Sequence, residues 1–258
     1  MRTVALLYLL FLLVLPVGLI CWRTFENGIG PVVDALTNDS AMHAFRLTLQ
    51  VAVPAVVLNT LFGLEAAILL ARHEFKGKRA FNALIDLPLA VSPVVVGLAL
   101  ILVYGRFTPF GGWLSDRGID VIFSVPGMVM ATVFVSLPLV VRAVQPVLEE
   151  IGVEQEQAAW TLGASTWQAF RRVTVPAIRW ALAYGMVLAL ARCLGEYGAV
   201  AVVSGNLVDQ TQTATLYVEQ AFNNFDQQAA YAMAFGLMVV AVLSLLVISL
   251  IRPKEETR

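Results

Sequence analysis

The sequence predicts an all-α, polytopic membrane helix bundle with six transmembrane helices. Hydrophobic residues make up 59% of the 258 residues, charged residues make up only 14%, and the mean hydropathy is +0.79. A soluble domain usually carries about 25% charged residues. Several apolar runs reach ~20 residues, the length of helix that crosses a bilayer core, and they do not alternate in polarity as barrel strands do. A soluble enzyme, a disordered chain and a secreted disulfide scaffold are therefore excluded.

Six segments are long and apolar enough to span a membrane. They are residues 4–22, 47–71, 80–104, 121–141, 180–204 and 227–251. A cleaved signal peptide is the alternative for the first segment, but its apolar core would be only ~7–15 residues long and would end at small residues. The run ends instead at Cys21-Trp22-Arg23, which favours a retained helix. Because no internal repeat or composition break divides the chain, residues 1–258 are expected to form one domain.

The distribution of Lys and Arg predicts that both termini lie in the cytoplasm, because cytoplasmic loops are enriched in these residues. With the N-terminus inside, twelve of them fall on the cytoplasmic side: Arg2, Arg72, Lys76, Lys78, Arg79, Arg142, Arg171, Arg172, Arg179, Arg252, Lys254 and Arg258. Four fall outside: Arg23, Arg46, Arg106 and Arg117. Glu65 and Asp86 lie near cytoplasmic ends of their segments, so they are expected to face water or the nearby Lys78 and Arg79.

The longest predicted cytoplasmic connection, residues 142–179, has helical character. Apolar residues recur in it at near-helical spacing among charged residues. Gly163 suits a helix C-terminus, and Ser165 suits the N-cap of a following helix. The pattern predicts two short helices with a bend at residues 163–165. Their apolar faces need cover from a protein partner or the membrane surface, and packing on the chain's own bundle is the plainer alternative.

This connection resembles the cytoplasmic signature loop of binding-protein-dependent ABC importer permeases. The family pattern is Glu-Ala-Ala, three residues, Gly, nine residues, then Ile-x-Leu-Pro. Here Gln157-Ala158-Ala159, Gly163 and a segment ending in Pro176 keep that spacing. Gln157 replaces the family Glu, and Glu156 is one position out of register, so it is expected to point elsewhere on the helix. The resemblance implies the MetI-like fold of type I importer permeases, with a coupling-helix loop that docks into a cytoplasmic ATPase subunit.

The resemblance extends over most of the chain to the CysW-type permeases of sulfate/thiosulfate ABC importers. Residues 86–105, 156–176 and 191–219 carry it. Molybdate and tungstate permeases share much of the third segment and the core at residues 194–199, so they are the main alternative. The Val-Val-Ser-Gly run at 202–205 and the Thr-rich stretch after it favour sulfate. The resemblance implies transport by alternating access across the bacterial cytoplasmic (inner) membrane.

The chain is expected to be a non-catalytic permease domain without cofactor or metal. It has no GxxxxGK[ST] phosphate loop, because Gly77-Lys78 lacks the upstream Gly and the following Ser or Thr. ATP and Mg²⁺ would be bound by a partner ATPase. By resemblance, the partners are a CysT-type permease that completes a heterodimer, a CysA-type ATPase dimer and an extracytoplasmic sulfate/thiosulfate-binding protein. No nucleic-acid partner is expected.

Arg192 and Glu196 lie four residues apart on one face of the fifth segment. Charged residues within the membrane are costly and usually face a bundle interior or a cavity. The pair is therefore either an internal structural ion pair or a source of positive potential, through Arg192, for an anion path. Ser92, Ser204 and Gly205 are further candidates for that path, because hydroxyl and freed backbone N–H groups can solvate an oxyanion weakly. Helix packing is the alternative explanation for the two serines.

Other functional classes fit the sequence less well. It contains no paired catalytic carboxylates, no nucleophile–base set and no metal-ligand cluster, and Cys21 and Cys193 in apolar stretches make neither a disulfide framework nor a metal site. A self-contained anion channel or secondary transporter is the alternative from another class. Such a protein would carry its coupling site on discontinuous helices near the membrane midplane. The long 142–179 connection argues against it.

Overall fold

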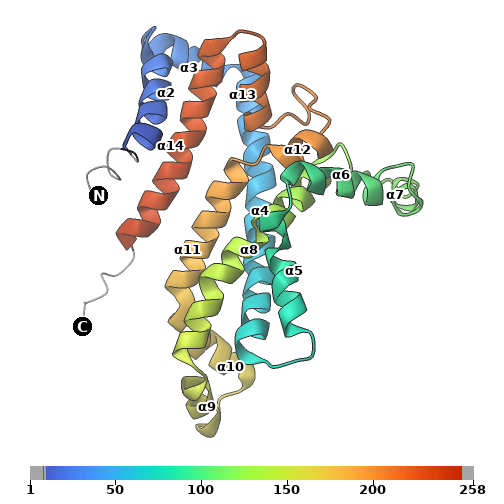
Figure 1. Ribbon diagram of the computed structural model, residues 1–258, viewed down its shortest axis with the longest axis vertical. Coiled ribbons are helices and arrows are strands. Elements are labelled where there is room, and N and C mark those ends of the chain that lie inside the picture. Colours follow the sequence, from blue (N-terminus) through green and yellow to red (C-terminus); the bar gives the residue numbers. More distant parts are fainter. Residues whose placement is uncertain (1–7, 9, 252–258) are drawn as a thin grey trace.

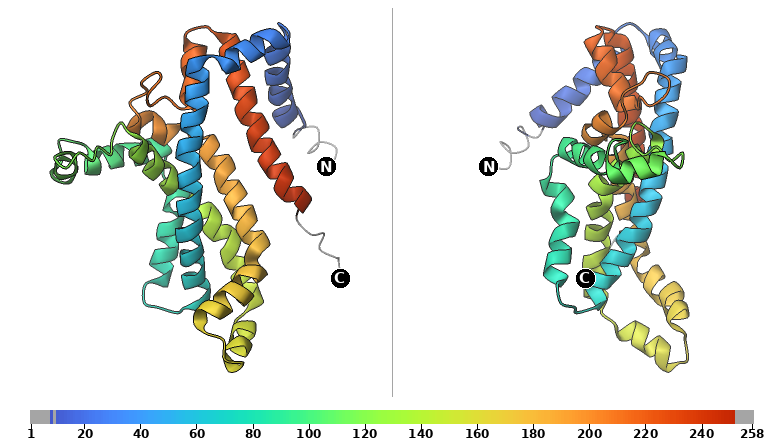
Figure 2. Two further views of the ribbon diagram at one scale, coloured as in Figure 1. Left: turned by 180° about the vertical axis from the view of Figure 1, so that it is seen from behind. Right: turned by 90° about the vertical axis from the view of Figure 1, so that its right-hand side faces the viewer.

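A computed structural model describes residue 8 and residues 10–251, and all regular structure in that part of the chain is helical (Figure 1). The elements are η1 (Leu10–Val14), α2 (Leu15–Phe25), α3 (Ile29–Thr37), α4 (Asp39–Arg72), α5 (Lys78–Ala90), α6 (Pro93–Tyr104), α7 (Pro109–Ser115), α8 (Val125–Ile151), α9 (Glu154–Thr161), α10 (Thr166–Ala169), η2 (Phe170–Thr174), α11 (Val175–Leu194), α12 (Gly198–Val203), α13 (Ala214–Asn223) and α14 (Gln227–Ile251). We name the end of the bundle that carries α9 and α10 the loop end, and the opposite end, with α3 and α13, the far end (Figures 1 and 2). The predicted all-α fold is confirmed.

Four helical runs are long and apolar enough to cross a membrane as single helices. They are α4, α8, the run Thr166–Leu194 that includes α11, and α14. Two further candidate spans are bent: the run Leu10–Phe25, which includes α2, meets α3 at 91°, and α5 meets α6 at 111°. By length and composition, the described chain therefore has four candidate spans, or up to six if each bent pair counts as one. Residues 4–7 and 9 of the first predicted span lie outside the described residues.

The third predicted span, 80–104, is not a straight membrane helix. Its first half, α5, has 13 residues and is about 20 Å long, whereas the bilayer core is ~30 Å thick. The break follows from Pro93, which begins α6. A residue before proline is driven out of the helical region, and Ser92 accordingly has a ψ angle of 134°. Val91, which ends α5, is also extended, with a ψ angle of 135°.

The fifth predicted span, 180–204, is also interrupted. Helix α11 ends at Leu194, and α12 begins at Gly198. Gly195 is a poor helix former, and the following Glu196 uses its side chain to accept a hydrogen bond from the Ala199 N–H at 3.0 Å. This bond satisfies one of the free N–H groups at the start of α12 and stabilises the break.

The core of the bundle lies where α4, α8 and α11 pack against one another. Small, fully buried residues line α4 at the contact, including Ala52, Ala55 and Ala67. They allow the helix backbones to approach closely, as is usual between membrane helices. The outward faces keep large apolar side chains exposed, such as Val53 and Leu61. Small residues inside and large apolar residues on the surface are the arrangement expected of a protein surrounded by lipid.

Helices α6 and α12 pack closely together, and α6 and α7 project sideways from the bundle (Figures 1 and 2). Gly97 makes the close contact possible: a Cβ atom at this position would lie 2.8 Å from Val202 Cβ and 2.9 Å from the Ala199 carbonyl oxygen. The N–H of Phe123 donates to the Val203 carbonyl at 2.8 Å. The second halves of the two broken spans therefore stabilise each other.

Gly97→Val should destabilise the fold, because its side chain would collide with α12. We expect a loss of about 1–3 kcal/mol in the free energy of unfolding, the usual cost of overpacking. The thermal midpoint of the detergent-solubilised protein measures it. Gly30→Val is the matched control, since a Cβ at Gly30 meets no atom within 4 Å. Equal effects in the two variants would contradict the close α6–α12 contact.

Candidate functional site

The connection at the loop end forms two short helices with a sharp bend between them. Helix α9 is followed by Gly163 at φ 85°, a left-handed conformation that glycine adopts without steric cost. Ser165 then caps α10 in a capping box: its hydroxyl accepts from the Gln168 N–H, and the Gln168 side chain accepts from the Ser165 N–H. The predicted helix pair, its bend and its cap are confirmed.

This loop exposes an apolar and aromatic surface, which we name the α9–α10 surface. Trp160 is 47% exposed, Leu162 88% and Trp167 65%. Of the residues singled out by the signature pattern, Gln157, Ala158, Gly163 and Pro176 are exposed and Ala159 is half-buried. Ala169 of α10 is buried, but the loop does not pack these three large apolar side chains on its own bundle. It presents them outward, together with small residues that permit close approach by another surface.

Glu156 anchors the loop to the bundle. Its Oε1 lies 3.1 Å from Nη2 of Arg72, at the end of α4, and accepts a hydrogen bond from the Thr174 hydroxyl at 2.8 Å. Arg72 Nη1 also donates to the Leu148 carbonyl on α8 at 2.9 Å. One carboxylate thus connects α9 to α4 and to the segment that leads into α11. Its inward direction agrees with the expectation that Glu156 points away from the face of Gln157, but sequence reasoning gave it no role.

The carboxylate of Asp86 was expected to face water or Lys78 and Arg79. Its side chain is 41% exposed, but its charged partner is neither of those two residues. Asp86 pairs with Arg142 on α8, whose Nε lies 2.8 Å from Oδ1 and whose Nη2 contacts Oδ2. Lys78 pairs instead with Glu74 at 2.6 Å. The Asp86–Arg142 pair joins α5 to α8 below the bend at Ser92. Glu65 is exposed on α4.

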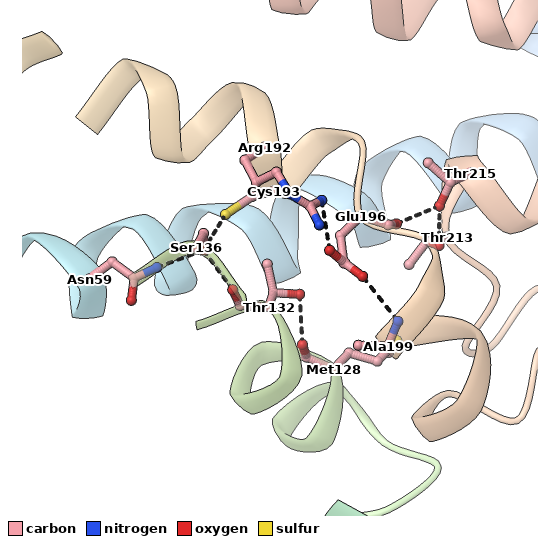
Figure 3. Close-up of polar contacts among 10 residues, drawn as sticks. All are labelled: Asn59, Met128, Thr132, Ser136, Arg192, Cys193, Glu196, Ala199, Thr213 and Thr215. Carbon is pink, nitrogen blue, oxygen red and sulfur yellow. Dashed lines mark hydrogen bonds and ion pairs between the residues drawn. The ribbon is translucent and has the colours of Figure 1, made fainter. Parts of the chain in front are cut away.

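Arg192 and Glu196 form an ion pair at the break between α11 and α12 (Figure 3). Arg192 Nη1 lies 2.8 Å from Glu196 Oε2, and the Arg192 side chain is 37% exposed, whereas that of Glu196 is 2% exposed. The contact lacks hydrogen-bond geometry, so Oε2 has no hydrogen-bond donor among the described residues. The cation is accessible while its counter-ion is buried.

A buried polar cluster that sequence reasoning missed lies beside this pair (Figure 3). The Asn59 amide on α4 donates to the Ser136 hydroxyl on α8 at 2.7 Å, and Ser136 contacts the Cys193 thiol on α11 at 3.3 Å. Ser136 also donates to the Thr132 carbonyl. The cluster joins the three core helices. The sequence signal was that Asn59 and Ser136 are polar residues within apolar spans.

The remaining candidate residues do not meet at one site. Ser92 is exposed at the α5–α6 bend, and Gly205 is exposed beyond α12. Ser204 is buried, and its hydroxyl accepts from the Asn206 N–H at 3.1 Å. Within the described residues, no hydrogen bond connects Ser92, Arg192 and Ser204. Any anion path through them would be a succession of separate contacts.

Glu156→Ala should loosen the loop, because it leaves the largely buried Arg72 without its ion-pair partner. Loss of one partner of such a pair costs about 2 kcal/mol or more, so amide hydrogen exchange over residues 154–174 should accelerate by roughly tenfold or more. Gln157→Ala is the control, since that neighbouring side chain is exposed. Equal exchange in the two variants would show that Glu156 does not anchor the loop.

Comparison with known proteins places the chain in a family. Residues 60–254 match the family described as "Binding-protein-dependent transport system inner membrane component". The sulfate transport system permease protein CysW of Synechocystis sp. is 48% identical over 241 residues, which cover 93% of this chain and 87% of that protein. The protein of the same name in Escherichia coli is 41% identical over 248 residues, with 96% and 85% covered.

A solved structure has the same fold. The crystal structure of a bacterial alginate ABC transporter in complex with an alginate pentasaccharide-bound periplasmic protein contains a chain that superposes with a TM-score of 0.79. The match covers 96% of this chain and 91% of that one at 18% identity. The shared fold and the sequence matches agree with the arrangement of helices described above. The chain belongs to the family of binding-protein-dependent transport system inner membrane components.

Proposed function

We propose that this multi-pass membrane protein is the permease subunit of an ATP-driven ABC importer that carries sulfate or thiosulfate across the bacterial cytoplasmic membrane. Sulfate is proposed as the substrate because this chain is 48% and 41% identical, over nearly its whole length, to two sulfate transport permeases. No observation on this chain favours molybdate or tungstate. The proposed path is formed by this subunit and a second permease of the CysT type.

The α9–α10 surface is the proposed docking site for the ATPase. It offers exposed aromatic side chains for a groove and the small residues Ala158, Ala159 and Gly163 for close approach. ATP and Mg²⁺ would be bound by a CysA-type ATPase dimer, and this chain would be non-catalytic. An extracytoplasmic sulfate/thiosulfate-binding protein would deliver the anion at the far end.

The loop end is the proposed cytoplasmic end. It carries a cluster of cations around the α4–α5 connection, namely Arg72, Lys76, Lys78 and Arg79, and cytoplasmic loops are enriched in Lys and Arg. Both termini would then be cytoplasmic. The N-terminal and C-terminal residues that would test this directly lie outside the described part of the chain.

Energetics supports a driven mechanism. A membrane potential of 100 mV, negative inside, opposes anion entry by about 2.3 kcal/mol per charge, or ~4.6 kcal/mol for a dianion. A self-contained channel would leak sulfate outward. Alternating access driven by ATP avoids this leak, because the path is never open to both sides at once.

Radiolabelled sulfate uptake tests the proposed function. Cells that lack their own sulfate permease would receive this chain with its partner subunits, and unlabelled thiosulfate and molybdate would serve as competitors. We expect uptake that requires this chain and that thiosulfate blocks but trace molybdate does not. Block mainly by trace molybdate or tungstate would overturn the substrate, and uptake without an ATPase would overturn the transporter class.

Trp160→Ala should weaken association with the ATPase. Truncation of a central aromatic at an interface costs about 2 kcal/mol, which is roughly 30-fold in Kd. Binding of the purified ATPase to the permease in nanodiscs measures it. Trp113→Ala is the matched control, because Trp113 is similarly exposed but lies on α7, away from the loop end. Equal losses, or none, would exclude the α9–α10 surface as the docking site.

A further inference from the structure

In the ion pair at the α11–α12 break, Glu196 is held more firmly than Arg192. Glu196 Oε1 accepts a hydrogen bond from the Ala199 N–H at 3.0 Å, and the Glu196 carbonyl accepts one from the Thr215 hydroxyl at 2.8 Å (Figure 3). Both ends of the residue are thus fixed, by α12 and by the start of α13. The carboxylate is also almost fully buried. These contacts restrict how far the carboxylate can move with its partner.

Arg192 is held much less firmly. A guanidinium carries five N–H donors, and the contact of Nη1 with Glu196 is the one that the described residues give it. More than a third of the side chain is exposed. Its other donors are therefore available for a further acceptor. A planar guanidinium binds oxyanions with two parallel N–H groups, as it binds carboxylate and phosphate.

A transport path requires binding that is strong enough for entry and weak enough for release. An accessible arginine within the membrane and without a counter-ion would hold a divalent oxyanion too firmly for rapid release. Glu196 prevents this, because its fixed carboxylate competes for the same guanidinium. The carboxylate of Glu196 offers Arg192 the kind of acceptor atoms that a sulfate offers.

We infer that Glu196 is an internal counter-anion for Arg192 that a transported sulfate displaces and that restores the empty state after the sulfate has left. In this role Glu196 is a positioning residue, since it acts on the anion through Arg192. The inference rests on the proposed function, because it takes sulfate as the transported ion. The sequence left two roles for the pair as alternatives, and the inference assigns both. Arg192 is paired with Glu196 when the path is empty, and it binds the anion when the path is occupied.

The test uses the complete transporter, reconstituted with its ATPase, partner permease and binding protein. Glu196→Gln removes the negative charge but keeps an oxygen that accepts from the Ala199 N–H. Retention of radiolabelled sulfate by the complex without binding protein should rise about tenfold, since the competing charge is gone. In uptake assays KM and kcat should both fall, because the anion binds more firmly and leaves more slowly. A purely structural role would not raise sulfate retention.

Two further variants sharpen the test. Glu65→Gln is the matched control, because it removes an exposed carboxylate on α4 and should leave retention and uptake unchanged. Glu196→Asp keeps the charge but shortens its reach toward Arg192, so it should give an intermediate increase, and it serves if the Gln variant does not assemble. Wild-type retention in every Glu196 variant that assembles, with normal sulfate uptake by the wild type, would overturn this inference alone. No sulfate uptake by the wild type would overturn the proposed function and the inference together.

Discussion

Hydrocarbon supplies no hydrogen bonds, so each polar group between the long helices of this protein needs a partner within the protein. The core meets much of this requirement with a chain of contacts from Asn59 through Ser136 to Cys193, which joins α4, α8 and α11. Asn59 Oδ1 has no hydrogen-bond partner among the described residues. The charge of Glu196 is balanced by the ion pair with Arg192. The same contacts that satisfy the polar groups also determine how the three helices are aligned. Rearrangement of the core would have to break them together.

The same constraint applies where a helix is broken. A broken helix frees backbone groups, and the structure pairs them locally: Glu196 accepts from the start of α12, and the Phe123 N–H donates to its end. Because α6 and α12 each follow a break and pack on one another through Gly97, the projecting arm formed by α6 and α7 is tied to the charged junction after α11. A shift of α12 with that arm would move the Ala199 N–H that donates to Glu196.

At the loop end, one side chain, Glu156, connects the α9–α10 helix pair to two core helices. Glu156 reaches the end of α4 through Arg72 and the base of α11 through Thr174. In the proposed importer, a force applied to the α9–α10 surface would act on both helices at once. The bend at Gly163 and the cap at Ser165 keep the two short helices in a defined arrangement. Coupling would then depend on rigid connections and not on the exposed side chains alone.

The sequence by itself determined the helical class, the apolar segments and the bend at Gly163–Ser165, because these depend on composition, run length and contacts between near neighbours. It also located Arg192 and Glu196, which lie one helical turn apart. Only the tertiary structure decided that Asp86 pairs with Arg142 and that Glu156 anchors to Arg72, since these partners lie 56 and 84 residues apart. It likewise decided the 111° turn after α5 and the burial of Glu196 beside an accessible Arg192. The direction of a helix and the burial of a side chain depend on which helices pack together, and local sequence does not determine that packing.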